Sequence, residues 1–261
     1  MNLKYTTEDL DYFISNIYFD NIENNSGGMK INDMFSFYFL LKNLRPTIII
    51  ESGVWNGFST KLIRKVLGSN CKIISLDPRE IPEDGFIDDN INTTYFTGTS
   101  FVDFKDLKIE EAINDKETIL CFFDDHQNAA QRLIQCVEKN ITHVFFNDNY
   151  PVNAGSHYSI QHLIDNDPRN CFNLSSQYYY SINTFPHIDI KNRLNLINKI
   201  DNYLVFPNVF SSKINLYEGI FDSNGFFYEN SNDYNDNISK YNIFYKNKEQ
   251  YCWNTYLTIK N

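Results

Sequence analysis

The nine residues 51–59, Glu-Ser-Gly-Val-Trp-Asn-Gly-Phe-Ser, constrain the fold of this chain more than any other stretch. An apolar run typical of a buried strand, Thr47–Ile50, leads directly into them. Four apolar residues follow at the spacing of one helical face: Leu62, Ile63, Val66 and Leu67. Gly53 and Gly57 have no Cβ, so they permit a tight turn and the close approach of a ligand. This order predicts an open α/β sheet with a ligand at the turn, although a plain strand-to-helix turn also has this spacing.

A second short strand, 73–76, ends in the carboxylate of Asp77. In open α/β sheets an acidic residue at this place holds the two hydroxyls of a ribose. The chain has no G-x-G-x-x-G, which a dinucleotide-binding turn would show. The glycine turn and Asp77 together therefore favour a different nucleoside-containing cofactor.

The stretch from about Met34 to Asn149 resembles the class I S-adenosylmethionine-dependent methyltransferases, and within them the divalent-metal-dependent catechol O-methyltransferase-like group. It covers a little under half of the chain. The resemblance implies that five residues surround the methionine part of the cofactor: Glu51, Gly53, Trp55, Gly57 and Ser59. It also implies that Asp77 holds the ribose and that the turn 98–100, with Ser100, lies under the adenine. Asp124 and His126 are further expected cofactor contacts.

Two more apolar runs end in polar clusters. Residues 119–123 precede Asp124-Asp125-His126, and residues 143–146 precede Asn147-Asp148-Asn149. A helical face lies between them: Ala130, Leu133, Ile134 and Val137. Both clusters are expected at the carboxyl edge of the sheet, where oxygen ligands suit Mg²⁺ or Mn²⁺. The resemblance implies Asp125, Asp148 and Asn149 as the metal ligands.

Each acidic cluster also has an ordinary structural interpretation. Asp124 or Asp125 suits the N-cap of the helix that begins near Gln127. Asp148-Asn149, just before Pro151, suits a turn.

Asn128 is a departure from the family pattern. The small-molecule enzymes of the group carry a lysine there as general base, and an asparagine cannot accept a proton. A metal lowers the pKa of a coordinated hydroxyl, which leaves less for a base to do. His126 and His157 are the catalytic candidates, because an imidazole accepts a proton near neutral pH. Ordinary solvent or packing roles are expected for the other histidines: His143, His162 and His187.

Composition limits the partners. The formal net charge of −10 argues against a nucleic-acid substrate, because binding phosphates needs a basic patch. The 22 Phe and 18 Tyr indicate extensive aromatic packing and a possible homo-oligomer. The five cysteines form no C-x-x-C pair, and no signal peptide or membrane-spanning run is visible. We therefore expect a cytoplasmic protein with reduced thiols and no membrane contact.

The expected fold class is α/β: a Rossmann-like methyltransferase sheet with helices on both faces and an antiparallel C-terminal strand pair. N-terminal helices are expected within 1–45, the S-adenosylmethionine-binding core within 46–150, and a substrate-side insertion with closing strands within 151–261. Apolar spacing predicts helices near 7–17, 34–44 and 156–165 and closing strands at 214–221 and 251–259. The segment 175–208 fits no motif of the family.

These features predict an S-adenosylmethionine-dependent, divalent-metal-dependent O-methyltransferase acting on a hydroxyl of a small polar metabolite. A sugar, a surface-glycan precursor or a natural-product precursor is favoured over a flat catechol, because the region after Asn149 is long and the family's lysine is absent. Two alternatives remain open at this point. One is a non-catalytic cofactor-binding protein, and the other is a metal-assisted hydroxylase or hydrolase on the same scaffold.

Overall fold

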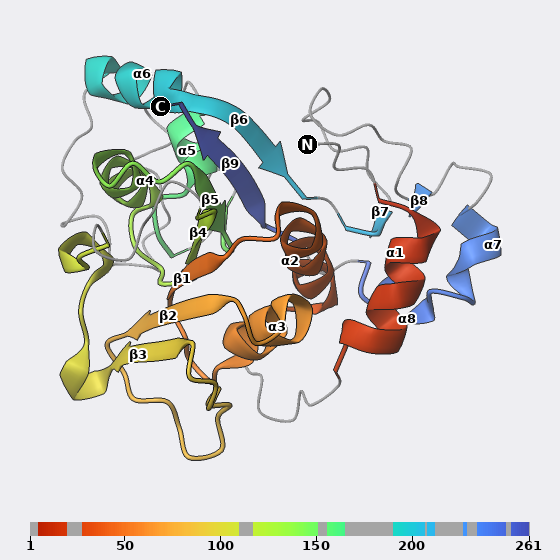
Figure 1. Ribbon diagram of the computed structural model, residues 1–261. Coiled ribbons are helices and arrows are strands. Elements are labelled where there is room, and N and C mark those ends of the chain that lie inside the picture. The colour runs from red at the N-terminus through yellow and green to blue at the C-terminus, as the bar shows by residue number, and fades with distance from the viewer. Residues whose placement is uncertain are drawn as a thin grey trace.

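A seven-stranded β-sheet forms the centre of the computed structural model, with strand order β3-β2-β1-β4-β5-β9-β6 (Figure 1). The structure describes residues 5–19, 28–109, 117–150, 156–164, 190–206, 208–211, 227–228, 234–248 and 252–260. The strands of the sheet are β1 (Ile48–Ser52), β2 (Lys72–Asp77), β3 (Thr93–Thr97), β4 (Ile119–Phe123), β5 (His143–Phe146), β6 (Ile200–Val205) and β9 (Thr255–Ile259).

Strand direction divides the sheet into two parts. β1 pairs in parallel with β2 and β4, β2 pairs with β3, and β4 pairs with β5. β9 runs antiparallel between β5 and β6. The chain passes from β1 to β2 and β3 on one side, then returns to β4 and β5 on the other, so the order reverses between β1 and β4. Ligands of open α/β sheets bind at the carboxyl ends of strands beside such a switch point.

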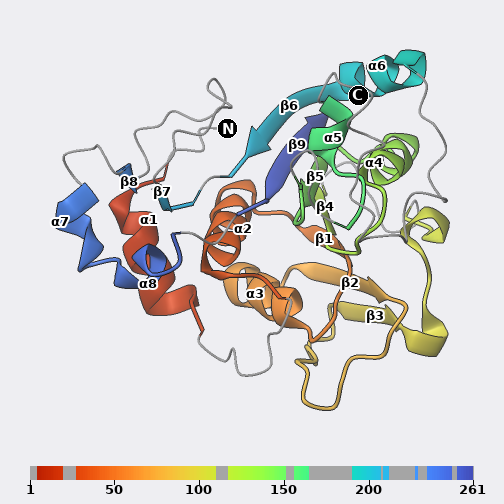
Figure 2. The same cartoon turned by 180° about the vertical axis from the view of Figure 1, so that it is seen from behind.

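Helices cover both faces of the sheet (Figures 1 and 2). One face carries α1 (Thr7–Tyr12), the π-helix η1 (Phe13–Ile17), α2 (Ile31–Leu44) and α3 (Phe58–Leu67). The other carries α4 (Ala129–Glu138), α5 (Ile160–Ile164) and α6 (Ile190–Lys199). The remaining elements are the 3₁₀ turns η2 (Gly98–Ser100) and η3 (Phe104–Asp106), the strand pair β7 (Phe210–Ser211) and β8 (Phe227–Tyr228), and α7 (Tyr234–Ile238) and α8 (Asn242–Tyr245) beside α1. The predicted fold class is therefore confirmed.

The central strands are apolar on both sides because both faces are covered. In β1, Ile49 packs in the cluster under α2 and α3, while Ile50 packs in the cluster under α4. Leu120 and Cys121 divide in the same way in β4. Successive side chains of a strand point to opposite faces, so a continuous apolar run feeds two hydrophobic cores.

The helical predictions were mostly accurate. Leu62 and Ile63 of α3 are fully buried, as the apolar spacing predicted. In α4 the predicted apolar face is wrong at one position, because Ile134 is 39% exposed whereas Cys136 is buried. The helix predicted from residue 156 begins later, at Ile160.

The predicted closing strands need a correction. The strand expected within 251–259 is present as β9, but its antiparallel partner is β6 rather than residues 214–221. The neighbours of β9 in the sheet are β5 and β6, so both of its edges are already paired. The segment 214–221 itself lies outside the described residues. α6 and β6, by contrast, form within the segment that fitted no family motif.

Four of the five cysteines, Cys71, Cys121, Cys136 and Cys252, are buried free thiols, and Cys171 lies outside the described residues. Among the helices that the structure describes, none combines the length and apolar character needed to cross a membrane.

Candidate functional site

The turn between β1 and α3 is held by its two glycines. Gly53 and Gly57 have φ angles of 94° and 75°, in the left-handed region that glycine adopts without strain. A Cβ on Gly53 would overlap the backbone carbonyl of Asp124, and one on Gly57 would overlap the carbonyl of Phe86. Backbone packing therefore requires both glycines, whether or not a ligand is bound. The same packing places the turn directly against the end of β4.

Asp77, at the end of β2, organises this turn. Its carboxylate oxygen Oδ2 accepts hydrogen bonds from the backbone N–H groups of Val54 at 2.9 Å and Trp55 at 3.0 Å. The other oxygen, Oδ1, accepts from the backbone and the Nε of Arg79. Burial alone would raise the pKa of Asp77, but the hydrogen bonds from Arg79 and the backbone outweigh it, so the pKa lies below its usual value. Asp77 is thus a carboxylate anion at the place predicted for a ribose contact.

Glu51 supports the turn from inside the protein. Its side chain is fully buried, and its Oε2 accepts hydrogen bonds from Thr60 at 2.6 Å and Ser75 at 2.7 Å. Ser59 is also buried. Burial raises the pKa of Glu51. The direct surroundings of Glu51 are hydroxyl groups of α3 and β2, so the structure places it behind the turn.

Trp55 and Ser100 are exposed members of the predicted cofactor set, as is His126. Trp55 has a φ of 49° and is 44% exposed, and the guanidinium carbon of Arg79 lies 4.5 Å from its ring centroid. Ser100 is exposed in η2, where its hydroxyl donates to the carbonyl of Thr97 at 2.9 Å.

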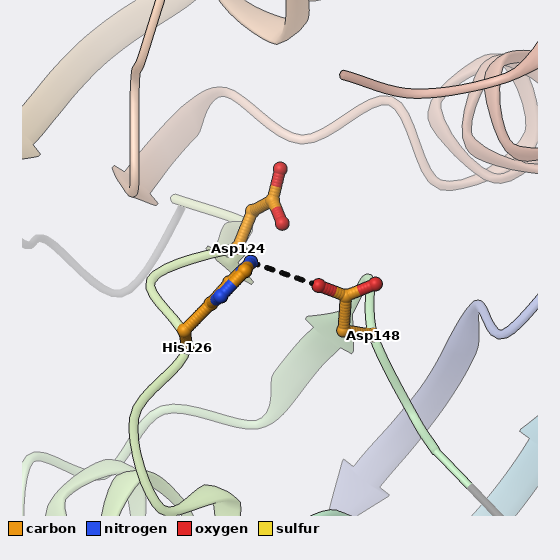
Figure 3. A group of neighbouring side chains, drawn as sticks. All are labelled: Asp124, His126 and Asp148. Atoms are coloured by element: carbon orange, nitrogen blue, oxygen red, sulfur yellow. Dashed lines mark ion pairs between the residues drawn. The ribbon is translucent and has the colours of Figure 1, made fainter. Parts of the chain in front are cut away.

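Asp124, His126 and Asp148 converge at the ends of β4 and β5 (Figure 3). One potential ligand atom from each lies within 4.8 Å of the other two. The Nε2 of His126 is 3.0 Å from Oδ2 of Asp148. His126 has a φ of 55°, unusual for a residue with a side chain, and this conformation turns its ring toward Asp148. Two strand ends and one strained loop position therefore build a three-residue cluster.

Two of the three predicted metal ligands, Asp125 and Asn149, have hydrogen-bond partners of their own, and their role as ligands stays a prediction. Oδ2 of Asp125 accepts hydrogen bonds from Ser52 at 2.7 Å and from Nε of Arg132 at 2.8 Å. Oδ1 of Asn149 accepts the backbone N–H of Gln161 at 2.8 Å. Of the predicted ligands, Asp148 belongs to the carboxylate and imidazole cluster, together with Asp124 and His126, which were predicted as cofactor contacts.

The charges of the cluster influence one another. Burial raises the pKa of Asp124 well above its usual value, and the nearby Asp148 adds to the effect. The hydrogen bond to Asp148 raises the pKa of His126. Burial lowers the pKa of His157 to about 4, so this imidazole is neutral at neutral pH. The centroids of the His126 and His157 rings are 5.5 Å apart, so the two predicted catalytic histidines do lie together.

Asn128 is the N-cap of α4. Its Oδ1 accepts the backbone N–H groups of Ala130 at 2.9 Å and Gln131 at 3.2 Å. The cap had been predicted at Asp124 or Asp125, and that prediction is wrong. Asp125 instead accepts the backbone N–H of Gln127 in the turn before the helix.

Sequence reasoning missed three residues that shape the site. Asn147 donates from Nδ2 to Oδ1 of Asp124 at 3.1 Å. Arg132 is buried and binds both Asp125 and Asp103, and Arg79 binds Asp77. Arg79 follows Asp77 by two positions, so the sequence did offer it as a possible partner of this carboxylate. His143 and His162 pack against Tyr256 and Tyr158, and His187 lies outside the described residues.

A small cavity of about 10 Å³ adjoins the cluster and is lined in part by Asp124, His126, Asp148 and His157. This volume is close to that needed for one water molecule, about 10–15 Å³. A larger cavity of about 480 Å³ lies near the amino ends of β1 and β2, between the carboxyl ends of α2 and α3. It is lined by the cations Lys42, Arg45 and Lys65, without an aspartate or glutamate. Chemistry rather than volume therefore identifies the candidate site.

A parallel sheet with one antiparallel strand inserted before its edge, together with a glycine turn at the carboxyl end of its central strand, defines a Rossmann-like methyltransferase fold. No family model matches the sequence, and a search of the curated proteins finds no match either.

Several solved structures are similar in fold. An O-methyltransferase from Bacillus cereus in complex with SAH has 12% identity over 98% of each chain and a TM-score of 0.44. TomG from Streptomyces achromogenes, an O-methyltransferase involved in tomaymycin synthesis and in complex with SAM, has 9% identity over 98% of this chain and 97% of its own, with a TM-score of 0.45. CmcI with Mg and SAM has 23% identity over 46% of this chain and a TM-score of 0.35. The chain spans about half of the CmcI chain, 53%.

Proposed function

We propose that this protein is an S-adenosylmethionine-dependent, divalent-metal-dependent O-methyltransferase that acts on a hydroxyl of a small polar metabolite. The observation that carries the proposal is the contact between two sites. The glycine turn, fastened to Asp77, packs against the backbone of Asp124, which belongs to the acidic cluster. A methyl donor over the turn and a hydroxyl at the cluster would therefore be neighbours, which is the condition for direct transfer between them.

The cofactor would lie over Gly53 and Gly57, with its ribose at Asp77 and its adenine near Ser100. The exposed ring of Trp55 supports a contact with the adenosine or the methionine part. Glu51 and Ser59 would not contact the cofactor directly but would hold α3 against β1 and β2. This assignment keeps the predicted cofactor residues but gives Glu51 and Ser59 a positioning role.

The acidic cluster fits a divalent cation. Asp124 and Asp148 offer carboxylate oxygens and His126 offers a ring nitrogen, all within 4.8 Å of one another. The adjoining cavity has room for about one water molecule. In addition, Oδ1 of Asn147 is buried and has no hydrogen-bond partner among the described residues. Mg²⁺ and Mn²⁺ prefer such oxygen-rich surroundings, and a bound ion would lower the pKa of an acceptor hydroxyl.

The protein groups nearby can handle the proton that the acceptor releases. His157 is neutral at neutral pH, because burial lowers its pKa to about 4, so one of its ring nitrogens is an acceptor. Ser156 lies between the two histidines, with its hydroxyl oxygen 3.2 Å from Nδ1 of His157 and 3.4 Å from Nδ1 of His126. This geometry supports His157 as proton acceptor and His126 as the residue nearer the cofactor and the cluster. Asn128 takes no part, because its side chain caps α4.

The class of methyl acceptor is inferred from the residue at position 128 and from the net charge. Asn128 replaces the lysine that the catechol-type enzymes of the group use, which supports a sugar, a surface-glycan precursor or a natural-product precursor. The net charge of −10 supports a small molecule rather than a nucleic acid. The four described cysteines are free and buried, which supports a cytoplasmic location, and the aromatic content supports a homo-oligomer.

Calorimetric titration with S-adenosylhomocysteine, followed by a methyl-transfer assay on a panel of sugars and phenols, tests the proposal. We expect cofactor binding in the presence or absence of EDTA, and transfer only when Mg²⁺ or Mn²⁺ is added. Undetectable S-adenosylhomocysteine binding with intact metal binding would favour the hydroxylase or hydrolase alternative. Cofactor binding without transfer to any hydroxyl would favour the non-catalytic alternative.

A further inference from the structure

Arg79 binds the carboxylate of Asp77, to which the proposed function assigns the cofactor ribose. Its backbone N–H and its Nε donate to Oδ1 of Asp77 at 2.8 Å and 3.1 Å, and its Nη2 donates to Oδ2 at 3.2 Å. Val54 and Trp55 donate their backbone N–H groups to Oδ2 as well. Asp77 thus receives five N–H donors and is only 1% exposed.

This carboxylate has no place left for a ribose. An ionised carboxyl group has about four lone-pair positions, and all are engaged here. Two of the backbone donors, from Val54 and Trp55, belong to the glycine turn, and the third, from Arg79, belongs to the loop directly after β2, so all three stay as long as these segments are folded. The guanidinium of Arg79 is the one group that can leave without unfolding β2 or the turn. A ligand that places two hydroxyls on Asp77 must therefore displace it.

The Arg79 side chain is placed to make such a movement. It is 58% exposed, whereas the Asp77 side chain is 2% exposed. Its guanidinium carbon lies 4.5 Å from the ring centroid of Trp55, which is itself partly exposed. The guanidinium side of this ion pair is open to solvent, so a ligand can take its place on the buried carboxylate without unfolding the loop.

We propose that Arg79 is a specificity-determining residue that closes the ribose position of Asp77 in the cofactor-free protein. A ligand with two adjacent hydroxyls replaces the two side-chain N–H donors one for one and opens the position. A ligand without that pair of hydroxyls displaces the guanidinium and leaves part of the buried carboxylate unpaired, which is unfavourable. The inference rests on the proposed function, because it takes the ribose of S-adenosylmethionine as the natural occupant.

Calorimetry with S-adenosylhomocysteine on Arg79→Ala tests the competition directly. We expect the Kd to fall roughly two- to fivefold, because the ligand no longer has to displace the solvent-exposed guanidinium. Arg79→Lys, which keeps the charge but loses the fork of donors, should give an intermediate Kd. Lys72→Gln is the matched control, since Lys72 lies at the other end of β2 and its loss changes the net charge equally. Its Kd should equal that of the wild type.

Salt and fluorescence give independent readouts. Salt weakens an exposed ion pair, so raising NaCl from about 50 to about 500 mM should tighten S-adenosylhomocysteine binding in the wild type and not in Arg79→Ala. The chain has two tryptophans, so Trp253→Phe leaves Trp55 as the single reporter. Its emission should change when S-adenosylhomocysteine displaces Arg79. In the double variant with Arg79→Ala, the emission should already be shifted before ligand is added.

The outcomes separate this inference from the proposed function. An unchanged Kd in Arg79→Ala would mean that Arg79 does not compete for Asp77. A raised Kd would mean that Arg79 contacts the cofactor instead of excluding it, and either result would overturn the inference while leaving the cofactor assignment intact. Undetectable binding to wild type, Arg79→Ala and Arg79→Lys alike would instead refute the cofactor assignment itself.

Discussion

Two adjacent aspartates after β4 have different tasks, and a pair of variants can separate them. Asp124 belongs to the cluster with Asp148, whereas Asp125 is bound by Ser52 and the buried Arg132. We expect Asp124→Asn to weaken Mn²⁺ binding at least about tenfold, because a neutral amide is a poorer ligand for a hard cation. Asp125→Asn should leave the Mn²⁺ affinity within about twofold but lower the stability by about 1–3 kcal/mol, since Arg132 loses one of its two carboxylates.

Calorimetry with Mn²⁺ and urea denaturation on both variants distinguish these effects, and Asp148→Asn should behave like Asp124→Asn. The reverse result, metal binding lost in Asp125→Asn and kept in Asp124→Asn, would restore the ligand set expected from the sequence.

His157 should make the protein sensitive to mild acid. Burial lowers its pKa to about 4 in the folded protein, whereas an unfolded histidine has a pKa of about 6.5. Between these values the unfolded chain binds a proton and the folded protein does not, so the contribution to stability is lost as the pH falls. The difference in unfolding free energy between wild type and His157→Gln should shrink by about 2–3 kcal/mol from pH 7 to pH 4. Urea titrations in EDTA measure it, and a difference that stays constant with pH would contradict the assignment.

At the scale of single residues, the sequence located the turn and the strand ends where the local pattern determines position, and the cofactor and metal roles of these residues stay predictions. Gly53, Gly57 and Asp77 were identified because strand, turn and strand end follow one another directly in the chain. The sequence does not distinguish the surroundings of Asp124 from those of Asp125, because neighbouring residues after a strand point in different directions and Arg132, which binds Asp125, comes from another element. Arg132 comes from a helix turn whose orientation no local spacing reveals.

At the scale of the helices and strands, Asn128 has a structural role as the N-cap of α4. Asn128 stands where the resembled enzymes have a lysine, and its side chain accepts two backbone N–H groups of the first helical turn. We expect Asn128→Ala to lower the unfolding free energy by about 1 kcal/mol, while Asn128→Asp keeps the cap and the stability. Asn128→Lys should be destabilised like the alanine variant. It should not raise methyl transfer, because the position serves the helix backbone.

Urea denaturation and the methyl-transfer assay together check this prediction. A lysine variant with wild-type stability and increased turnover would show instead that the position can still supply a base.

The parallel half of the sheet was predictable for the same reason as the glycine turn. β1, β2, β4 and β5 are continuous apolar runs, because helices cover both of their faces. β6 was not identified, since Ile-Asp-Asn-Tyr-Leu-Val alternates poorly and lies at the edge of the sheet, partly exposed. Its pairing with β9 joins segments about 55 residues apart, and such long-range pairing leaves no local signal.

At the scale of the whole molecule, buried hydrogen bonds join α2, near the start of the chain, to the residues just before β9, near its end. Asp33 of α2 is 7% exposed, and its Oδ2 accepts the backbone N–H of Lys30 at 3.1 Å. Asn254, which precedes β9, donates to the backbone carbonyl of Asp33 at 3.0 Å and to Ser36 at 2.7 Å. Cys252 lies 3.7 Å from Ser36. The position of α2 over the sheet therefore depends on contacts with the C-terminal strand.

Asp33 should oppose His157 in the pH dependence of stability. Burial raises its pKa from 3.8 to about 7, so between these values the unfolded chain is ionised at this residue while the folded protein holds the proton. The folded state then binds more protons than the unfolded state, and stability falls as the pH rises through this window. Asp33→Asn keeps an acceptor for the Lys30 N–H and cannot ionise. We expect it to match the wild type near pH 4 and to exceed it by about 2–4 kcal/mol at pH 8, since each pKa unit is worth about 1.4 kcal/mol. Urea titrations of both proteins across this range measure the difference, with Asp89→Asn at an exposed position as the control. A gain that is already complete at pH 4, or absent at pH 8, would mean that Asp33 does not carry its proton in the folded protein.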